Sequence, residues 1–103
     1  MGNTQTRSRE KLSYDDVKDV IKIIAEAKQS QDYTLVKVSQ VQTLLKIEKD
    51  LEVSRKTIRD KGISHQGYFE KKYPDACTYK YTGDTNKRGL LINPGLMLEE
   101  LQK

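Results

Sequence analysis

Residues 47–58, IEKDLEVSRKTI, hold two helix signals separated by a short break. Ile47 and Leu51 are one helical turn apart, which is the spacing that the apolar side of a helix produces. Ser54 is a favourable N-cap for a second helix, because its hydroxyl can accept a hydrogen bond from an amide of the first turn. In that second helix Ile58 would face the core. The stretch therefore predicts two helices joined by a tight turn, the second of them short and basic.

An amphipathic helix and a short strand precede this stretch. Ser13 and Asp16 have the spacing of a capping box, and apolar side chains then recur at helical intervals. These apolar side chains are Val17, Val20, Ile21, Ile24 and Ala27. We expect a helix over residues 14–29, followed by a strand in YTLVKV, residues 33–38.

A second capping box opens the helix before the break. Ser39 and Gln42 have the required spacing, and helical periodicity continues to Asp50. The expected apolar side consists of Val41, Leu44, Leu45, Ile47 and Leu51. This helix would support the short basic helix that follows it.

A hairpin is predicted near the C-terminus. ACTYKYT, residues 76–82, alternates in the manner of a strand, and LLIN, residues 90–93, can pair with it. The loop between them, GDTNKRG, has glycine at both ends, as a hairpin loop favours. Pro94 would end the second strand.

The segments before and after the hairpin differ in how clearly their sequence predicts a structure. Residues 63–75 allow two interpretations, because Tyr68, Phe69 and Tyr73 either extend the helical core or close a loop over it. Residues 95–103, GLMLEELQK, have the pattern of a short helix. Its apolar side would be made of Leu96, Met97 and Leu101.

The composition fits one small domain with a basic C-terminal half. The chain has 103 residues, of which 35% are hydrophobic and 33% charged, enough for one modest core. We expect residues 1–12 to form a flexible tail and residues 13–103 to form the domain. Residues 1–53 contain nine Lys/Arg and nine Asp/Glu, whereas residues 54–103 contain ten and six, so the second half carries the whole net charge of +4. This asymmetry favours an anionic partner.

The stretch around the break resembles a known motif. Ile47, Leu51, Val53 and Ser54, followed by Thr57-Ile58, are similar to the pattern L-x-x-x-L-G-V-S-x-x-T-V of bacterial helix-turn-helix regulators. With a strand between the first two helices and a basic hairpin after the third, the chain resembles a winged helix-turn-helix domain. The resemblance implies an α+β fold with a three-helix core, a small antiparallel β-wing and a short C-terminal helix.

The resemblance also implies a set of DNA-binding residues. The third helix would lie in the major groove, where arginine and lysine can donate to guanine. The base-edge candidates are Arg55, Lys56 and Arg59, with Lys61 beyond them, while Ser54 and Thr57 would meet phosphate. The wing candidates are Asn86, Lys87 and Arg88 at the hairpin tip, with Lys80 on the strand assisting.

The function that follows from the resemblance is sequence-specific binding of double-stranded DNA. The chain would act in the cytoplasm, at the nucleoid, as a small transcriptional regulator or as a plasmid or phage replication or partition factor. A single module buries little surface on DNA, so a homodimer through the apolar side of the C-terminal helix is expected. The departures from the pattern are Glu48 and Glu52, where a small residue and glycine are usual, and Lys61-Gly62, where an apolar anchor is usual.

Two other functions remain open. A winged-helix fold can serve as a protein-interaction module. MGNTQT, residues 1–6, matches the N-myristoylation pattern, and Arg7, Arg9 and Lys11 would add the electrostatic signal of a matrix-type peripheral membrane protein. The alternative for the same residues is a flexible basic arm that binds along DNA.

Catalysis, metal binding and a membrane span are not expected. His65 is the only histidine, and no Ser/His/Asp set or glycine-rich phosphate loop can be assembled. We therefore expect no enzyme activity, no metal and no cofactor. Cys77, the only cysteine, is expected to be a small core residue in a reducing compartment. No apolar run approaches the roughly 18 residues that a membrane span requires.

Overall fold

Five helices and three strands make up the part of the chain that this computed structural model describes, residues 12–80 and 88–103. In chain order they are α1 (Tyr14–Ala27), β1 (Thr34–Val36), α2 (Val38–Lys49), α3 (Arg55–Asp60), α4 (Tyr68–Lys72), β2 (Cys77–Lys80), β3 (Gly89–Ile92) and α5 (Pro94–Leu101). The fold class is α+β, as expected. The additional helix α4 lies in the segment that the sequence left open, so the core has more than three helices.

Helix α1 begins at the predicted capping box. Ser13 Oγ accepts a hydrogen bond from the Asp16 amide at 3.1 Å, and the Ser13 amide donates to the Asp16 carboxylate at 3.4 Å. The buried side of the helix is formed by Val17, Val20, Ile21, Ile24 and Ala25. Ala27, which the periodicity placed on this side, is exposed because the helix ends there.

The prediction that Ser39 and Gln42 cap α2 is wrong. The helix begins at Val38, and the Lys37 amide donates to Gln40 Oε1 at 2.8 Å, so the cap lies two residues earlier. The strand β1 is correspondingly shorter than predicted. Ser39 lies inside the helix, and this frees Gln42 for another contact.

The prediction that Ile47 and Leu51 share the buried side of α2 is also wrong for Ile47. Its side chain is 68% exposed. The helix ends at Lys49, and Asp50 adopts a left-handed conformation with φ of 52°. This turn redirects the chain so that Leu51, 1% exposed, enters the core from outside the helix.

The strands form one antiparallel sheet in the order β1-β3-β2. Leu90 of β3 faces Val36 of β1 in the register, and Ile92 faces Cys77 of β2. Gly89 is required where β3 meets β1, since a Cβ there would lie 2.5 Å from the Val36 carbonyl oxygen. The predicted hairpin is therefore part of a larger sheet, and residues 81–87, between β2 and β3 in the sequence, lie outside the described residues.

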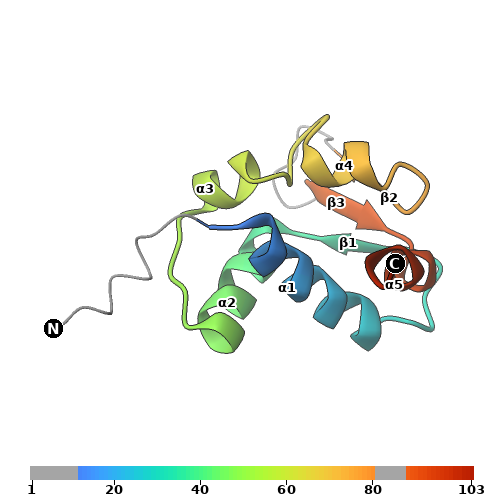
Figure 1. Cartoon of the computed structure of the whole chain (residues 1–103), viewed down its shortest axis with the longest axis horizontal. Coiled ribbons are helices and arrows are strands. Elements are labelled where there is room, and N and C mark those ends of the chain that lie inside the picture. The colour runs from blue at the N-terminus through green and yellow to red at the C-terminus, as the bar shows by residue number, and fades with distance from the viewer. Residues whose placement is uncertain (1–11, 81–87) are drawn as a thin grey trace, which may run out of the picture.

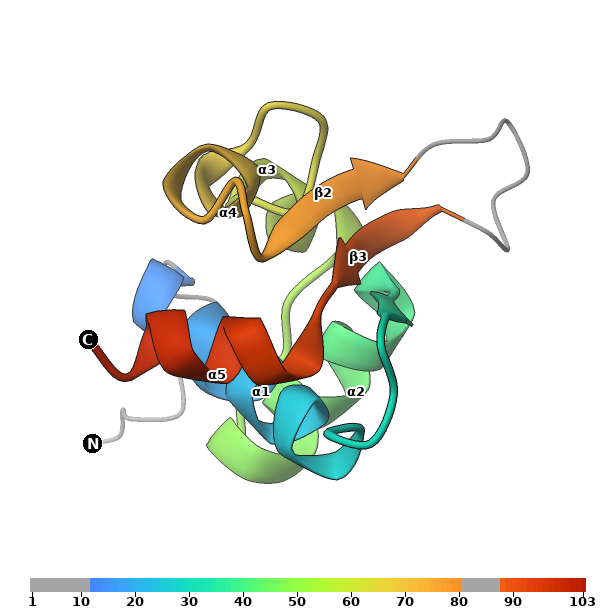
Figure 2. The same ribbon diagram turned by 90° about the vertical axis from the view of Figure 1, so that its right-hand side faces the viewer.

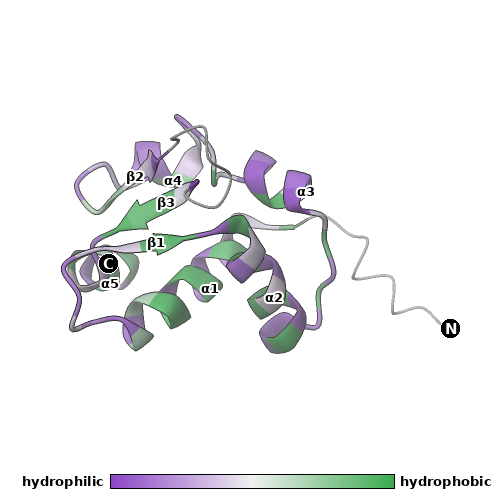
Figure 3. Ribbon diagram, turned by 180° about the vertical axis from the view of Figure 1, so that it is seen from behind, coloured by the Kyte–Doolittle hydropathy of each residue, from purple (hydrophilic) through white to green (hydrophobic). Residues whose placement is uncertain are grey.

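The helices lie on both sides of this sheet. Figure 1 shows α1 and α2 along one side and α4 beside β2 on the other. Figure 2 shows β2 and β3 running out together, away from the helices. In Figure 3 most of α3 is hydrophilic and β3 is hydrophobic. The core therefore lies between α1, α2, α5 and the sheet, and continues under α3 and α4 through Ile58, Ile63 and Phe69, which are fully buried.

Helix α5 packs against α1 within the same chain. Asn93 caps it by accepting from the Leu96 amide at 3.0 Å, and Pro94 occupies its first turn. Met97 and Leu101 are buried. Most of the apolar side that we expected to form a homodimer surface is thus already covered by α1.

Candidate nucleic-acid interface

Helix α3 is fixed at its start and from beneath. Ser54 Oγ accepts a hydrogen bond from the Thr57 amide at 3.1 Å, which confirms the predicted cap. Ile58 is fully buried, and Val53 packs against the core just before the helix. Anchoring on this side leaves the opposite side of α3 facing solvent.

Three cationic side chains lie on the outer part of α3. Arg55 and Lys56 are exposed and Arg59 is half-buried. Arg55 and Arg59 are four residues apart and therefore share one side of the helix. Lys56 forms an ion pair with Asp60 at 2.9 Å, and both side chains are mostly exposed. The net charge of the helix is thus positive, three cations against one carboxylate.

Gln42 links α2 to the turn and to α3. Its Nε2 donates to the Val53 carbonyl at 2.9 Å, and its Oε1 accepts from Arg55 Nε at 3.3 Å. One amide therefore holds the turn and restricts the first arginine of α3. The sequence assigned Gln42 to a helix cap instead. Its contact with Val53 and Arg55 depends on the path that the chain takes after Asp50, which local sequence patterns do not show.

Three other predicted site residues make contacts within the protein. The hydroxyls of Ser54 and Thr57 are 2.9 Å apart and bond to each other. Lys61 lies over the Tyr14 ring, with Nζ 4.9 Å from the ring centre. Tyr14 is in turn stacked on Tyr68 at 4.0 Å. The contacts of Lys61 with Tyr14 and of Tyr14 with Tyr68 tie the end of α3 to α1 and α4. Lys61 therefore lies at the edge of the solvent-facing side of α3.

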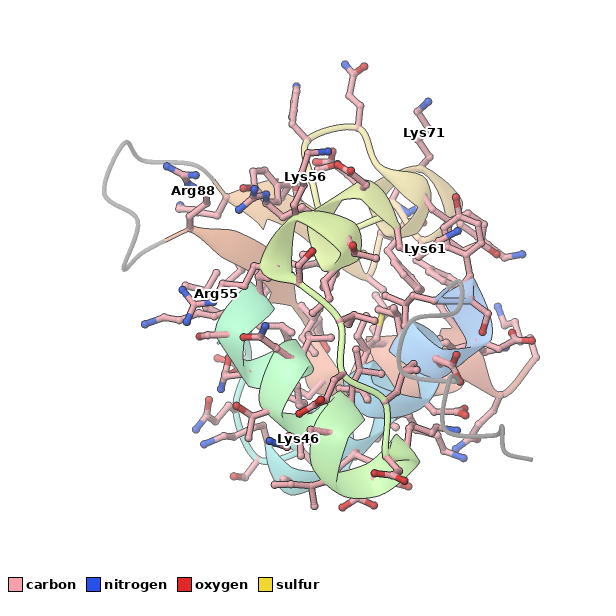
Figure 4. The ribbon with its side chains drawn as sticks, turned by 90° about the vertical axis from the view of Figure 1, so that its left-hand side faces the viewer. Lys46, Arg55, Lys56, Lys61, Lys71 and Arg88 are labelled. Atoms are coloured by element: carbon pink, nitrogen blue, oxygen red, sulfur yellow. The ribbon has the colours of Figure 1, made fainter. Side chains whose placement is uncertain are left out.

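The hairpin brings a further cation to the same side of the molecule. In Figure 4 the side chains of Arg55, Lys56 and Arg88 lie toward one edge of the molecule, and Lys61 lies at the other end of α3. Arg88 is half-buried and directly precedes β3. Lys80, at the end of β2, is exposed and faces Gly89 in the register. The predicted wing residues Asn86 and Lys87 lie outside the described residues.

Glu70 holds the segment between α3 and β2 in place. Its carboxylate accepts hydrogen bonds from the Gln66 amide, from the Thr78 hydroxyl at 2.8 Å and from the Tyr79 amide at 3.0 Å. Burial alone would raise the pKa of this carboxyl, but these hydrogen bonds and the nearby His65 lower the pKa below its ordinary value. Because β2 is an edge strand, the carboxylate also provides an acceptor for a backbone amide of that strand, the Tyr79 amide.

Cys77 lies behind this network as a buried core thiol. Its Sγ donates to the Phe69 carbonyl at 3.2 Å. Burial, assisted by the negative charge of Glu70, raises the pKa of the thiol to about 12. The side chain is therefore an unreactive core residue at neutral pH, as the sequence predicted.

Residues 12–80 and 88–103 contain no metal-binding cluster and no membrane-spanning helix. Within these ranges no three His, Cys, Asp or Glu side chains are grouped so that they could hold a metal ion. His65 Nδ1 is 3.8 Å from the Glu70 carboxylate, and its side chain is largely exposed. None of the helices in the same ranges is both long and apolar enough to cross a bilayer.

Comparison with known protein families, curated proteins and solved structures gives no match to this chain.

Proposed function

We propose that the protein binds double-stranded DNA sequence-specifically as a winged helix-turn-helix domain, with α3 in the major groove. The proposed wing is the β2–β3 hairpin, which contacts the backbone or the minor groove. The order of elements supports this arrangement: α1, β1, α2 and α3 precede the hairpin, and α4 is an insertion between α3 and β2. The protein would act by occupying its site, as a transcriptional regulator or as a phage or plasmid replication or partition factor.

The observation that carries the proposal is the orientation of α3. Ile58 is fully buried, while Arg55 is exposed and Arg59, one turn further along the same short helix, is half-buried. A pair of arginines at this spacing can reach neighbouring base pairs, and bidentate donation to guanine O6 and N7 is the commonest specific contact. Gln42 supports this role because it restricts Arg55 before any DNA is bound.

The remaining cations fit contacts to phosphate. Arg88 and Lys80 come from the base of the hairpin, and in Figure 4 Lys56 lies between Arg88 and Lys61 at the far end of α3. Phosphate contacts supply most of the affinity of such proteins and make it fall as salt rises. The ion pair between Lys56 and Asp60 is exposed and contributes little stability, so phosphate can compete for Lys56.

The test is DNA binding by fluorescence anisotropy, with the preferred duplex first selected from a random pool. Arg55→Ala and Arg59→Ala should each weaken binding to that duplex by about 1–3 kcal/mol and relax its sequence preference. Lys80→Ala and Arg88→Ala should weaken binding to all duplexes and lower the slope of log affinity against log salt by about one per residue.

A matched control uses Lys22, an exposed lysine on α1. Lys22→Ala changes the net charge by the same amount and should leave both the affinity and the salt slope nearly unchanged. DNA binding that survives charge reversal of Arg55, Lys56 and Arg59 together would contradict the proposal. That result would favour a winged-helix module that binds a protein.

A further inference from the structure

The outer side of α2 carries a surface of which the DNA proposal uses only Gln42. Ile47, at 68%, is the most exposed large hydrophobic side chain in the described part of the chain. It lies beside a groove of about 490 Å³ between α2 and the segment that leads to α3. We call this region the α2 outer surface, and its residues are Gln42, Thr43, Lys46, Ile47, Glu52 and Val53.

The charge of this region does not suit DNA. Its two charged side chains, Lys46 and Glu52, have opposite signs, so the region carries no net charge. Helix α3, in contrast, has three cations and one carboxylate. A duplex approaching α3 would therefore gain nothing from the α2 outer surface, and a protein is the better occupant for an exposed isoleucine beside a groove.

The α2 outer surface is complementary to itself. It has a protruding apolar side chain, Ile47, and a groove lined by Val53 that can receive one. It also has one cation and one anion, Lys46 and Glu52, which form an ion pair at 3.1 Å with side chains 67% and 66% exposed. A two-fold axis through the middle of this patch, between Lys46 and Glu52, brings each of these features opposite its complement, because both subunits of such a dimer use the same patch.

We propose that a second copy of this chain binds the α2 outer surface in a two-fold symmetric dimer. Ile47 of each subunit enters the groove next to the partner's Val53, and Lys46 pairs with the partner's Glu52. Both charges have a partner before and after association, so the exchange leaves no charge unpaired in the interface. The gain comes from removing both isoleucines from water. This dimer does not require DNA.

The experiment is sedimentation equilibrium without DNA, with two charge variants measured alone and mixed. Lys46→Glu makes the patch doubly negative and Glu52→Lys makes it doubly positive, so neither variant should dimerise with itself. An equimolar mixture should restore dimers, because each subunit then faces its opposite charge. Neither variant has the ion pair within its own chain, so recovery on mixing reports pairing between subunits. A mixture that stays monomeric would overturn the proposal.

A second variant tests the apolar contact. Ile47→Asp should raise the dissociation constant of the wild-type dimer by about tenfold or more. It should still fold, because the side chain is exposed, and its thermal unfolding should match that of wild type. Tyr33→Asp, which alters another exposed hydrophobic side chain (61%), is the control and should leave the dimer unchanged. A wild-type protein that is monomeric at all concentrations, or a dimer insensitive to Ile47→Asp, contradicts the inference.

Discussion

Gln42 and Arg55 are joined by a hydrogen bond of 3.3 Å between Arg55 Nε and Gln42 Oε1, although thirteen residues separate them. The same glutamine donates to the Val53 carbonyl at 2.9 Å. The amide thus connects a supporting helix, a turn and the first cation of α3. The orientation of that cation depends on a side chain outside α3 itself.

Replacing Gln42 should affect both stability and the proposed DNA contact. Gln42→Ala leaves the half-buried Val53 carbonyl without its donor, and we expect the free energy of unfolding to fall by about 1 kcal/mol. Arg55 also loses its restraint, so discrimination between duplexes should fall more than affinity for random DNA. Urea unfolding and anisotropy measure the two effects.

Gln42→Glu separates these two roles. The carboxylate can still accept from Arg55, but it cannot donate to Val53. We expect stability to fall as in Gln42→Ala while sequence preference is retained. Equal loss of preference in both variants would mean that the contact between Gln42 and Arg55 has no part in recognition.

The loop from α3 to α4 should not tolerate side chains at its glycines. Gly62 has a φ of 120°, and a Cβ there would lie 2.9 Å from Phe69 Cδ2. Gly62→Ala should therefore destabilise the protein by about 2 kcal/mol or more, measured as a shift in the urea midpoint. Gly95→Ala is the control, because the nearest atom to its Cβ would be 3.8 Å away and α5 should gain up to about 1 kcal/mol. Similar effects of the two changes would be inconsistent with a constrained loop.

Stability should fall in acid partly because of Glu70. Its pKa is lowered in the folded protein, so the ionised carboxylate stabilises the fold above the ordinary value of 4.5. This stabilisation is lost as pH falls through the lower, folded pKa. Glu70→Gln should reduce stability at neutral pH and flatten the acid decline, measured by thermal unfolding from pH 7 to pH 3. Glu26→Gln removes a carboxylate from an exposed position of α1 and controls for net charge; an equal flattening there would exclude a special role for Glu70.

The single thiol should report unfolding. The pKa of Cys77 is raised to about 12 by burial, and its Sγ donates to the Phe69 carbonyl. Ellman's reagent at pH 8 should therefore label the native protein only as fast as the protein opens, and label it at once in denaturing urea. Rapid labelling under native conditions would show that β2 detaches readily from α4.

The caps of α1 and α3 followed from local sequence, whereas the cap of α2 and the existence of α4 did not. Ser13 and Ser54 cap α1 and α3 as predicted, because a cap depends on residues within one turn of each other. The buried side of α1 and the inward position of Ile58 followed from periodicity for the same reason. The hairpin strands were also located to within a residue or two. The signals were the alternation in residues 76–82 and the loop with glycine at both ends that follows it.

The contacts that define the candidate site were decided by tertiary structure. Ile47 has helical spacing to Leu44 and Leu51, yet it is exposed, because α2 buries Val41 and Leu45 and Ile47 lies on another side of the helix. Leu51 fills the core only after Asp50 redirects the chain. The bond between Gln42 and Arg55 and the Glu70 network join residues that local patterns cannot relate. Local sequence fixes hydrogen bonds and faces within an element. Which side chains meet across elements depends on how every turn directs the chain, and a single left-handed residue was enough to change it here.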